Sequence, residues 1–349
     1  MFKKTICLLA LIILSQSSLL AIDVMQEGSD DELVLFTVPS YCELDWSSPK
    51  ALLISATKSY ATPQFRSYSK RAIGHVFILL RSSSAEYDVL TGMVTGQEDE
   101  LKTLALEKGY GLGVLGADVK GKLEEKEKLE VETNDRLARG TLAYIRFKLS
   151  QETSKRLFDY YEMYRDRGHC NHYGGANRPR YSEGGGCSAF GVSFLEVAGL
   201  MTMDYESNWQ VEVNIPEKHY GGPLTGKNVP FSDVVVDNWK DSKWAVDDEA
   251  HINLKMWDPS LIYKWILAQH ARELKDGTPY YLAVTFGKAK GLVVDCRQMP
   301  TPTEPVFLDV CKAPNPYGRQ PGLYPGDNNS NVARNHSIGI NHMDISLAP

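Results

Sequence analysis

The side chain best suited to covalent chemistry in this chain is Cys187, which follows a run of three glycines at 184–186. The apolar pattern at 188–200 predicts a helix that begins at this cysteine. Unpaired backbone N–H groups and the positive end of the helix dipole favour a thiolate there, the form that attacks carbonyl carbon. A cysteine in an apolar stretch is also often a small buried hydrophobe or half of a disulfide. Cys187 is therefore a candidate nucleophile, with a structural role as the alternative.

A thiol hydrolase also needs an imidazole that takes the thiol proton and hands it to the leaving group. His75 lies near the start of an apolar run at 72–80 that predicts a strand. A rigid sheet can hold an imidazole about 3–4 Å from a thiol at a helix N-terminus, where the resulting ion pair lowers the pKa of the thiol. The structural alternative is a hydrogen-bonded core histidine.

The loop that precedes the cysteine, at 169–186, is rich in His, Asn, Gly and Arg, and we expect it to form one wall of a cleft. Hydrogen bonds to a bound carbonyl or to the imidazole are expected from Asn171, His172 and Tyr173. Arg178 and Arg180 are expected to bind a carboxylate, which suits an acidic peptide or acyl substrate. A Gly/Asn loop held by its own backbone hydrogen bonds is the alternative.

The same loop permits a different chemistry, because His169, Cys170, His172 and Cys187 are four possible zinc ligands within nineteen residues. A structural zinc site is closed and tetrahedral. The His-Cys-Asn-His run is tighter than usual ligand spacing, and the chain has no Cys-x-x-Cys pair. The prediction is therefore a site without metal or cofactor, with structural zinc kept as an alternative.

Periodic segments predict the elements that position these residues. Strands are expected at 33–38, 72–80, 87–91 and 141–149, the second and third as a hairpin. Ser150 is expected to cap a helix that runs to 167, and Gly199 to end the Cys187 helix. The charged stretch at 97–139 predicts a solvated insertion, to which no function is assigned. Beyond 210 we expect strands at 209–215 and 234–236, a helix at 259–274, and a hairpin of 280–286 with 291–294.

The order of these elements is informative: a Gly-His-apolar strand, a second strand, a helix, then a Gly-Cys-Ser-Ala-Phe helix that ends in Ala-Gly-Leu. It resembles the circularly permuted branch of the papain-like fold, which holds NlpC-like thiol hydrolases and relatives of lecithin retinol acyltransferase. The resemblance covers about residues 70–200. It implies Cys187 as nucleophile, His75 as base, and an α+β fold with an antiparallel sheet packed on the cysteine-bearing helix, followed by a C-terminal extension.

The resemblance also implies a third polar residue that orients the imidazole, on the strand after the histidine. Thr91 and Asp88 are the candidates on the strand expected at 87–91. Successive side chains of a strand point to opposite faces, so these two have opposite parity and cannot both face His75. The identity of the third residue stays open between them.

The start of the chain has the pattern of a secretory signal peptide. Lys3 and Lys4 precede an apolar run at 5–14, and small residues precede Asp23, so cleavage is expected after Ala21. The run is too short and too poorly flanked for a stable membrane span; an apolar N-terminal strand is the alternative. Cleavage would change the formal net charge from −6 to −8, and no basic patch stands out, which argues against a nucleic-acid partner.

Five cysteines remain after this cleavage, and an odd number leaves one thiol unpaired in an oxidising compartment. Cys296 and Cys311 flank a Pro-rich loop and are expected to pair. If Cys42 pairs with Cys170, Cys187 is free. A Cys170–Cys187 bridge is the competing possibility and would remove the nucleophile.

Together these features predict a signal peptide at 1–21, a permuted papain-like thiol hydrolase domain at 22–215 and a C-terminal extension at 216–349 that is able to pack on the same body. The expected activity is that of an exported cysteine hydrolase, periplasmic or secreted, that cleaves amide or ester bonds through an acyl-thioester at Cys187. Peptide, peptidoglycan or acyl-amide substrates are expected, with no transmembrane segment after cleavage. A non-catalytic envelope binding module on the same scaffold is the alternative.

Overall fold

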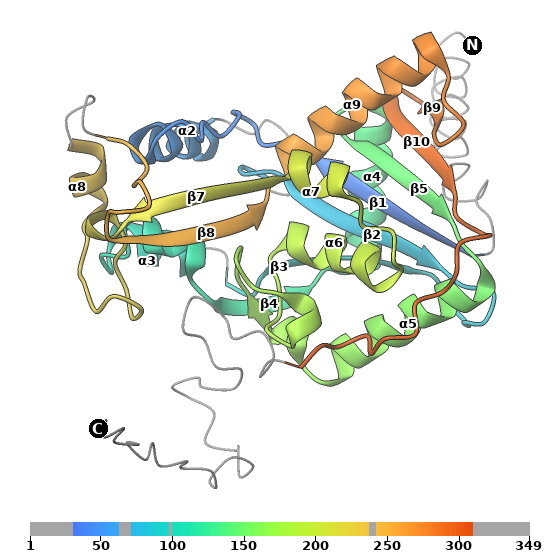
Figure 1. Cartoon of the computed structure of the whole chain (residues 1–349), viewed down its shortest axis with the longest axis horizontal. Coiled ribbons are helices and arrows are strands. Elements are labelled where there is room, and N and C mark those ends of the chain that lie inside the picture. The colour runs from blue at the N-terminus through green and yellow to red at the C-terminus, as the bar shows by residue number, and fades with distance from the viewer. Residues whose placement is uncertain (1–30, 63–70, 98–99, 237–241, 310–349) are drawn as a thin grey trace, which may run out of the picture.

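The computed structural model describes residues 31–62, 71–97, 100–236 and 242–309. They form an α+β fold around an eight-stranded mixed sheet (Figure 1). Its strands are β1 (Glu32–Val38), β2 (His75–Arg81), β3 (Val89–Thr95), β4 (Val119–Leu123), β5 (Ala143–Lys148), β6 (His172–Tyr173), β9 (Leu282–Phe286) and β10 (Ala289–Asp295). Their spatial order is β6-β4-β3-β2-β1-β5-β10-β9, and all neighbours are antiparallel except β5 and β10, which are parallel.

Strand β2, in the middle of the sheet, is apolar without a break at 76–80 because helices cover both faces of the sheet. Along β2, Val76 and Ile78 pack into one core cluster, while Phe77 and Leu79 pack into the cluster on the opposite face. All four side chains are almost fully buried. A strand covered on both faces reads as a continuous hydrophobic run rather than as an alternation.

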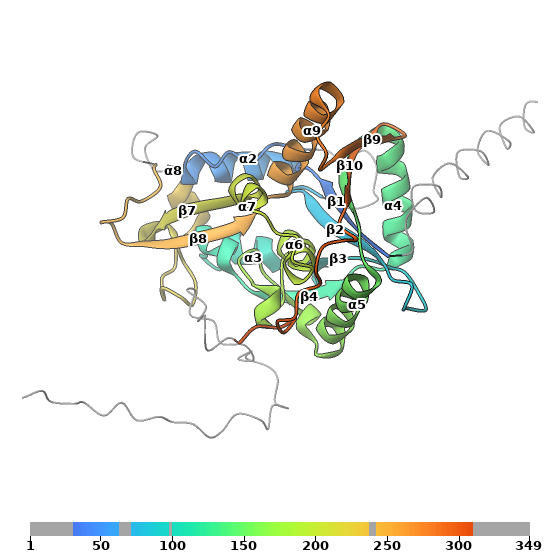
Figure 2. The same cartoon turned by 45° about the vertical axis from the view of Figure 1, so that its right-hand side comes forward.

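One face of the sheet carries the cysteine-bearing helix α6 (Cys187–Val197), with α5 (Gln151–Asp166) and α9 (Pro259–Asp276) beside it. The other face is covered by α4 (Lys126–Arg139), whose Leu129 and Leu137 join the second core cluster. Two views show α6 and α4 on opposite sides of β1, β2 and β3 (Figure 1 and Figure 2). The sheet is therefore the middle layer of three.

A smaller part of the molecule extends from one end of this body. The hairpin of β7 (Gln210–Pro216) and β8 (His251–Trp257) forms a separate two-stranded sheet. It shares an apolar cluster with α2 (Pro49–Ala61) and α8 (Phe231–Val236). The remaining elements are α3 (Glu100–Leu106), α7 (Met203–Trp209) and short 3₁₀ turns, η1 (Leu112–Gly116), η2 (His169–Asn171), η3 (Pro179–Tyr181) and η4 (Glu217–His219).

Most expected elements are present, and the helix ends follow from local chemistry. The side chain of Ser150 accepts a hydrogen bond from the backbone N–H of Thr153 and caps α5 as predicted. Gly199 adopts φ +69° just beyond α6 and ends that helix. The predicted hairpins β2–β3 and β9–β10 are both antiparallel pairs.

Two expectations were wrong. The segment at 234–236 is the end of helix α8 and not a strand. In this short helix Val234 is the residue buried in the neighbouring apolar cluster, as expected for a helix with one inward side. The charged stretch at 97–139 is not a solvated insertion, because it supplies β4 to the main sheet and the inner face of α4 to its core.

The expected boundary near residue 216 falls at the end of β7, whose partner β8 lies beyond it. Further along, β10 pairs with β5 in the main sheet. The segment at 242–309 is thus packed with the rest of the described chain. Among the described residues, no helix is long and apolar enough to cross a membrane.

Candidate active site

Cys187 is the first residue of α6, as the sequence predicted. The residue before it, Gly186, takes an extended conformation and has no side chain to cap the helix. The first backbone N–H groups of α6 are therefore left without a side-chain cap at the thiol. Cys187 is a free cysteine, half-buried at this end of the helix.

The glycine run before Cys187 lies against β6 and the turn that follows it. The backbone N–H of Gly186 donates to the carbonyl of Gly174 (2.7 Å), and that of Gly185 donates to the carbonyl of His172 (3.2 Å). Gly184 adopts φ +75°, and a Cβ there would lie 2.4 Å from the carbonyl oxygen of His172. The glycines thus allow close approach of two backbones, which places Cys187 beside Tyr173.

His75 is the first residue of β2 and is buried. Its side chain lies close enough to the thiol of Cys187 to lower the pKa of that thiol, as does the backbone N–H of the next residue, Val76. The imidazole also forms an ion pair, in which Nε2 lies 2.6 Å from Oε2 of Glu124. Because Nε2 is engaged in this way, we infer that Nδ1 faces the thiol.

Glu124, the residue directly after β4, is thus the third polar residue of the site. Neither candidate from the sequence holds the imidazole. Thr91 donates from Oγ1 to the backbone carbonyl of Glu124 (3.0 Å), so it supports the segment that carries the carboxylate. Asp88 pairs with Arg81, the last residue of β2, at the end of that strand remote from His75 (3.0 Å). The carboxylate comes instead from β4, which pairs with β3.

Gly92 on β3 leaves the space in which the imidazole and the carboxylate meet. A Cβ at this position would lie 2.8 Å from Oε2 of Glu124 and 3.0 Å from Nε2 of His75. It would also lie 2.9 Å from the Cβ of Phe77, on the facing strand. Contacts this short force at least one of these groups to move.

The variant Gly92→Ala is therefore expected to displace the pair and to slow alkylation of Cys187 at pH 6 at least about tenfold, with roughly 1–3 kcal/mol lost in stability. Iodoacetamide kinetics followed by mass spectrometry and urea denaturation measure the two effects. Gly96→Ala is the matched control, since the nearest atoms to its Cβ would be the Cβ of Lys120 at 3.2 Å and backbone atoms of Lys120 at 3.4 Å or beyond, with no contact to His75 or Glu124 among them. An unchanged alkylation rate in Gly92→Ala would contradict the described contact.

The charges of the site stabilise one another. Burial opposes ionisation of Cys187, but the hydrogen bond and charge of His75 outweigh it and lower the pKa of the thiol to about 7. Burial and the charge of Arg71 oppose protonation of His75, yet Glu124 and Cys187 outweigh them and raise its pKa above the usual 6.5. Burial likewise opposes the carboxylate of Glu124, but His75 and Arg71 lower its pKa to about 2. The arrangement favours a thiolate beside an imidazolium.

Two tyrosines flank the thiol. Tyr173 lies beside Cys187, and burial together with the nearby sulfur raises the pKa of its hydroxyl well above the usual 10. Tyr60, from α2, is close enough that the charge of Cys187 raises the pKa of its phenol, after burial as the larger cause. Lys102 of α3 lies 5.9 Å from the centre of the Tyr60 ring. Tyr173 was predicted as a site residue, whereas Tyr60 and Lys102 were not.

The two loop arginines have partners within the chain. Arg178 pairs with Glu183 (2.5 Å) and stacks on the ring of Tyr181. Arg180 is almost fully buried and donates to the backbone carbonyls of Pro305 and Val306. Both guanidinium groups thus hold parts of the chain together, and their expected role in binding a substrate carboxylate stays a prediction.

The other two loop residues lie on β6 and its entry turn. His172 lies opposite Lys120 in the antiparallel pairing of β6 with β4. Its Nδ1 lies 3.9 Å from Oδ2 of Asp118. Asn171 is exposed at the end of η2, where its amide oxygen lies 4.0 Å from the sulfur of Cys170. Their predicted role in hydrogen bonding to a bound carbonyl or to the imidazole stays a prediction.

The four described cysteines, Cys42, Cys170, Cys187 and Cys296, are all free thiols. Neither of the two pairings considered for Cys170, with Cys42 or with Cys187, is therefore present among the described residues. Cys296 is buried in the main core cluster, and its expected partner, Cys311, lies outside the described residues. The thiol of Cys187 is thus available for chemistry.

The zinc alternative finds no ligand cluster in the part of the chain that the structure describes, where no three His, Cys, Asp or Glu side chains converge on a metal position. His169 packs its ring against Tyr164 and Phe307, and burial lowers its pKa to about 4. His172 and Cys187 instead make the separate contacts described above. The four candidate ligands are close in sequence, but their side chains contact different groups.

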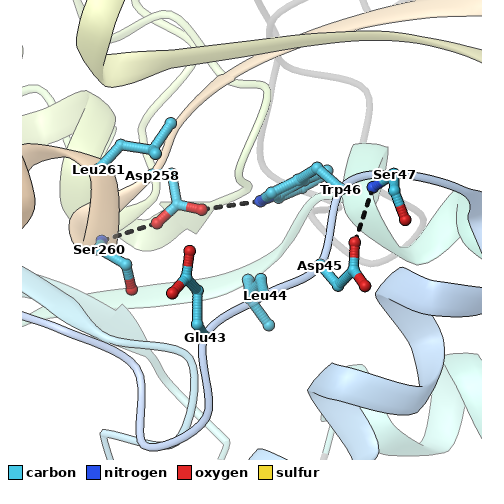
Figure 3. Close-up of a pocket in the computed structure, with 8 residues that line it drawn as sticks. All are labelled: Glu43, Leu44, Asp45, Trp46, Ser47, Asp258, Ser260 and Leu261. Carbon is cyan, nitrogen blue, oxygen red and sulfur yellow. Dashed lines mark hydrogen bonds between the residues drawn. The ribbon is translucent and has the colours of Figure 1, made fainter.

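A pocket elsewhere in the molecule has a structural explanation (Figure 3). It lies between the segment after β1 and the start of α9, and its polar lining includes Asp258, Trp46 and Ser260. Asp258 caps α9 through the backbone N–H of Ser260 (2.7 Å) and accepts a hydrogen bond from the indole of Trp46 (2.8 Å). None of its eight lining residues belongs to the Cys187 site.

Glu124 was missed because it sits in the charged stretch at 97–139, where its carboxylate looks like its neighbours. The available signal was the alternation of Val119, Gly121 and Leu123 with lysines, which is typical of a half-buried strand. Antiparallel pairing of that strand with β3 carries the next residue to His75.

No family model matches the chain, and neither a curated protein nor a solved structure was found to be similar to it.

Proposed function

We propose that this protein is a cysteine hydrolase that cleaves amide or ester bonds by acyl transfer to Cys187. The observation that carries the proposal is the line of groups from the thiol through His75 to Glu124, with the 2.6 Å ion pair at its far end. A nucleophile, a base and a group that orients the base are what such chemistry requires. The location of the thiol on the first turn of a helix adds backbone N–H groups.

Each step uses groups already in place. The sulfur of Cys187 attacks the carbonyl carbon, while the proton of the thiol resides on His75. The imidazolium then gives this proton to the leaving amine or alcohol, which leaves an acyl-thioester. Water, deprotonated by the neutral imidazole, attacks the thioester carbonyl; the C–S bond breaks, the carboxylic acid product leaves, and the sulfur shares the proton of the imidazolium again. The N–H of Cys187 and the hydroxyl of Tyr173 are the donors proposed to stabilise the negative oxygen of the tetrahedral intermediate.

Two further assignments belong to this proposal. A core like that of the permuted papain-like hydrolases is supported by the packing of α6 on β2 and β3 and by the position of His75 at the start of a strand. Export is supported by the pattern of residues 1–21, which lie outside the described residues. For an exported enzyme of this type, peptidoglycan peptides are the first proposed substrates, followed by lipid or protein amides.

The proposal is tested with the protein lacking residues 1–21, incubated with peptidoglycan fragments, peptide amides and acyl esters and analysed by mass spectrometry. Hydrolysis products are expected from the unaltered protein and from Cys170→Ala, which removes a thiol outside the site. Cys187→Ala is expected to lose turnover by at least about a thousandfold, because no other group forms the acyl intermediate. Turnover that survives in Cys187→Ala would overturn the proposal. So would a folded, thiol-reactive protein that hydrolyses none of these substrates, which would favour a non-catalytic binding module.

A further inference from the structure

The carboxylate that orients His75 is itself held by Arg71, which lies four residues before that histidine. One guanidinium nitrogen, Nη2, lies 2.6 Å from Oε1 of Glu124 and 2.8 Å from Oε2 of Glu132. A second nitrogen, Nε, donates to the other oxygen of Glu132 (3.2 Å). The side chain of Arg71 is 6% exposed, so its contacts with the two carboxylates are shielded from solvent.

Glu132 occupies a position on α4 where an apolar residue would be expected. It shares the inward face of the helix with Leu129, Thr133 and Leu137, and its side chain is only 3% exposed. Glu130, two residues earlier on the same helix, is 43% exposed. Burying a carboxylate is unfavourable by several kcal/mol unless partners offset it, and apolar packing is often at least as stabilising as a buried ion pair. Packing of α4 alone therefore does not explain Glu132.

The buried charges alternate in sign from the thiol to the other face of the sheet. Thiolate, imidazolium, Glu124, Arg71 and Glu132 follow in that order, and Arg136 closes the series at 2.7 Å from Glu132. The charged groups that act on His75 are Arg71, which disfavours the imidazolium, and Glu124 and Cys187, which favour it. The carboxylate of Glu132, on the far side of Arg71, offsets the positive charge by which Arg71 disfavours protonation of His75.

We propose that Glu132 is a positioning residue of the active site, which acts through Arg71 to fix the carboxylate of Glu124 against His75 and to keep the imidazole protonated beside the thiolate. The proposal rests on the proposed function for the roles of Cys187 and His75. It extends that function to α4, on the face of the sheet opposite α6 (Figure 2). Arg71 bridges the two carboxylates with a planar fork that a lysine does not offer.

Two substitutions are expected to shift the pKa of His75 in opposite directions. Glu132→Gln removes a negative charge and leaves the cation of Arg71 less offset, so the pKa of His75 should fall by roughly 0.5–1 unit. Arg136→Gln removes a positive charge from the end of the series, so the same pKa should rise by a few tenths of a unit. Glu130→Gln, on the exposed side of α4, is the matched control and should leave the pKa within about 0.1 unit of its starting value.

The measurement is a titration of protein labelled with ¹⁵N-histidine by NMR, with the His75 signals assigned by their loss in His75→Gln. A thermal melt of each variant identifies any that fails to fold. If Glu132→Gln fails to fold, the direction of the His75 pKa shift in Arg136→Gln decides alone. Opposite shifts support the inference, because general damage to the site would move both variants in the same direction. A His75 pKa that does not move in Glu132→Gln and Arg136→Gln would overturn it. Failure of the proposed function is distinguishable, since these titrations need no substrate and no turnover.

Discussion

Replacing His75 with alanine is expected to slow alkylation of Cys187 by iodoacetamide at pH 6 about 100-fold. With a pKa of about 7, roughly one tenth of the thiol is ionised at that pH. Without the imidazole, burial returns the thiol to a pKa at or above its ordinary value of 9, where about one thousandth is ionised. Mass spectrometry of quenched samples gives the rate at each cysteine separately.

Cys170 serves as the internal reference in this experiment, because it is half-buried in the loop before Cys187 and its pKa is raised by burial. Its alkylation rate should be the same with and without His75. Equal rates for Cys187 in the two proteins would mean that His75 does not activate the thiol. The catalytic assignment would then fail, whatever the substrate.

The second large effect is expected from Glu124→Gln, which should lower the free energy of unfolding at pH 7 by about 3 kcal/mol. The variant leaves Arg71 and His75 without the carboxylate that contacts both. The pKa of Glu124 is lowered from 4.5 to about 2, so its stabilising effect is complete above about pH 4.5 and is lost as the pH falls toward 2. The difference between variant and unaltered protein should therefore narrow to about 1 kcal/mol at pH 3.

Urea denaturation at pH 7 and pH 3 measures both values. Glu125→Gln is the matched control, since this neighbouring carboxylate is exposed to solvent and pairs with Lys128 at the surface. It should change stability little at either pH. A Glu124→Gln protein as stable as the control at pH 7 would show that the carboxylate is not engaged as described.

The sequence pointed to Cys187 and His75 as site residues because both stand at the start of strongly apolar elements. The runs that contain β2 and α6 are recognisable without any partner, and glycines mark the entry to each one. Gly74 adopts φ +81° immediately before β2, and Gly186 precedes α6. Which residues begin these elements, and hence where His75 and Cys187 lie, was therefore predictable from local pattern.

The third group of the site depended on long-range pairing, which local pattern does not reveal. Glu124 reaches His75 only because β4 pairs with β3, and a glycine at position 92 leaves room for the contact. Similarly, the parallel pairing of β10 with β5 joins segments more than a hundred residues apart. Arg178 and Arg180 looked like free cations, but their partners are a loop carboxylate and backbone carbonyls that only the fold brings near.

The claim that Cys187 is held as a reactive thiolate is tested most directly by the pH dependence of its alkylation in the unaltered protein. Rates for Cys187 and Cys170 are measured in the same samples from pH 4 to pH 10. The structure predicts a midpoint near pH 7 for Cys187 and one above the ordinary thiol value of 9 for Cys170. A midpoint at 9 or higher for Cys187, or no reaction at all, would contradict the account.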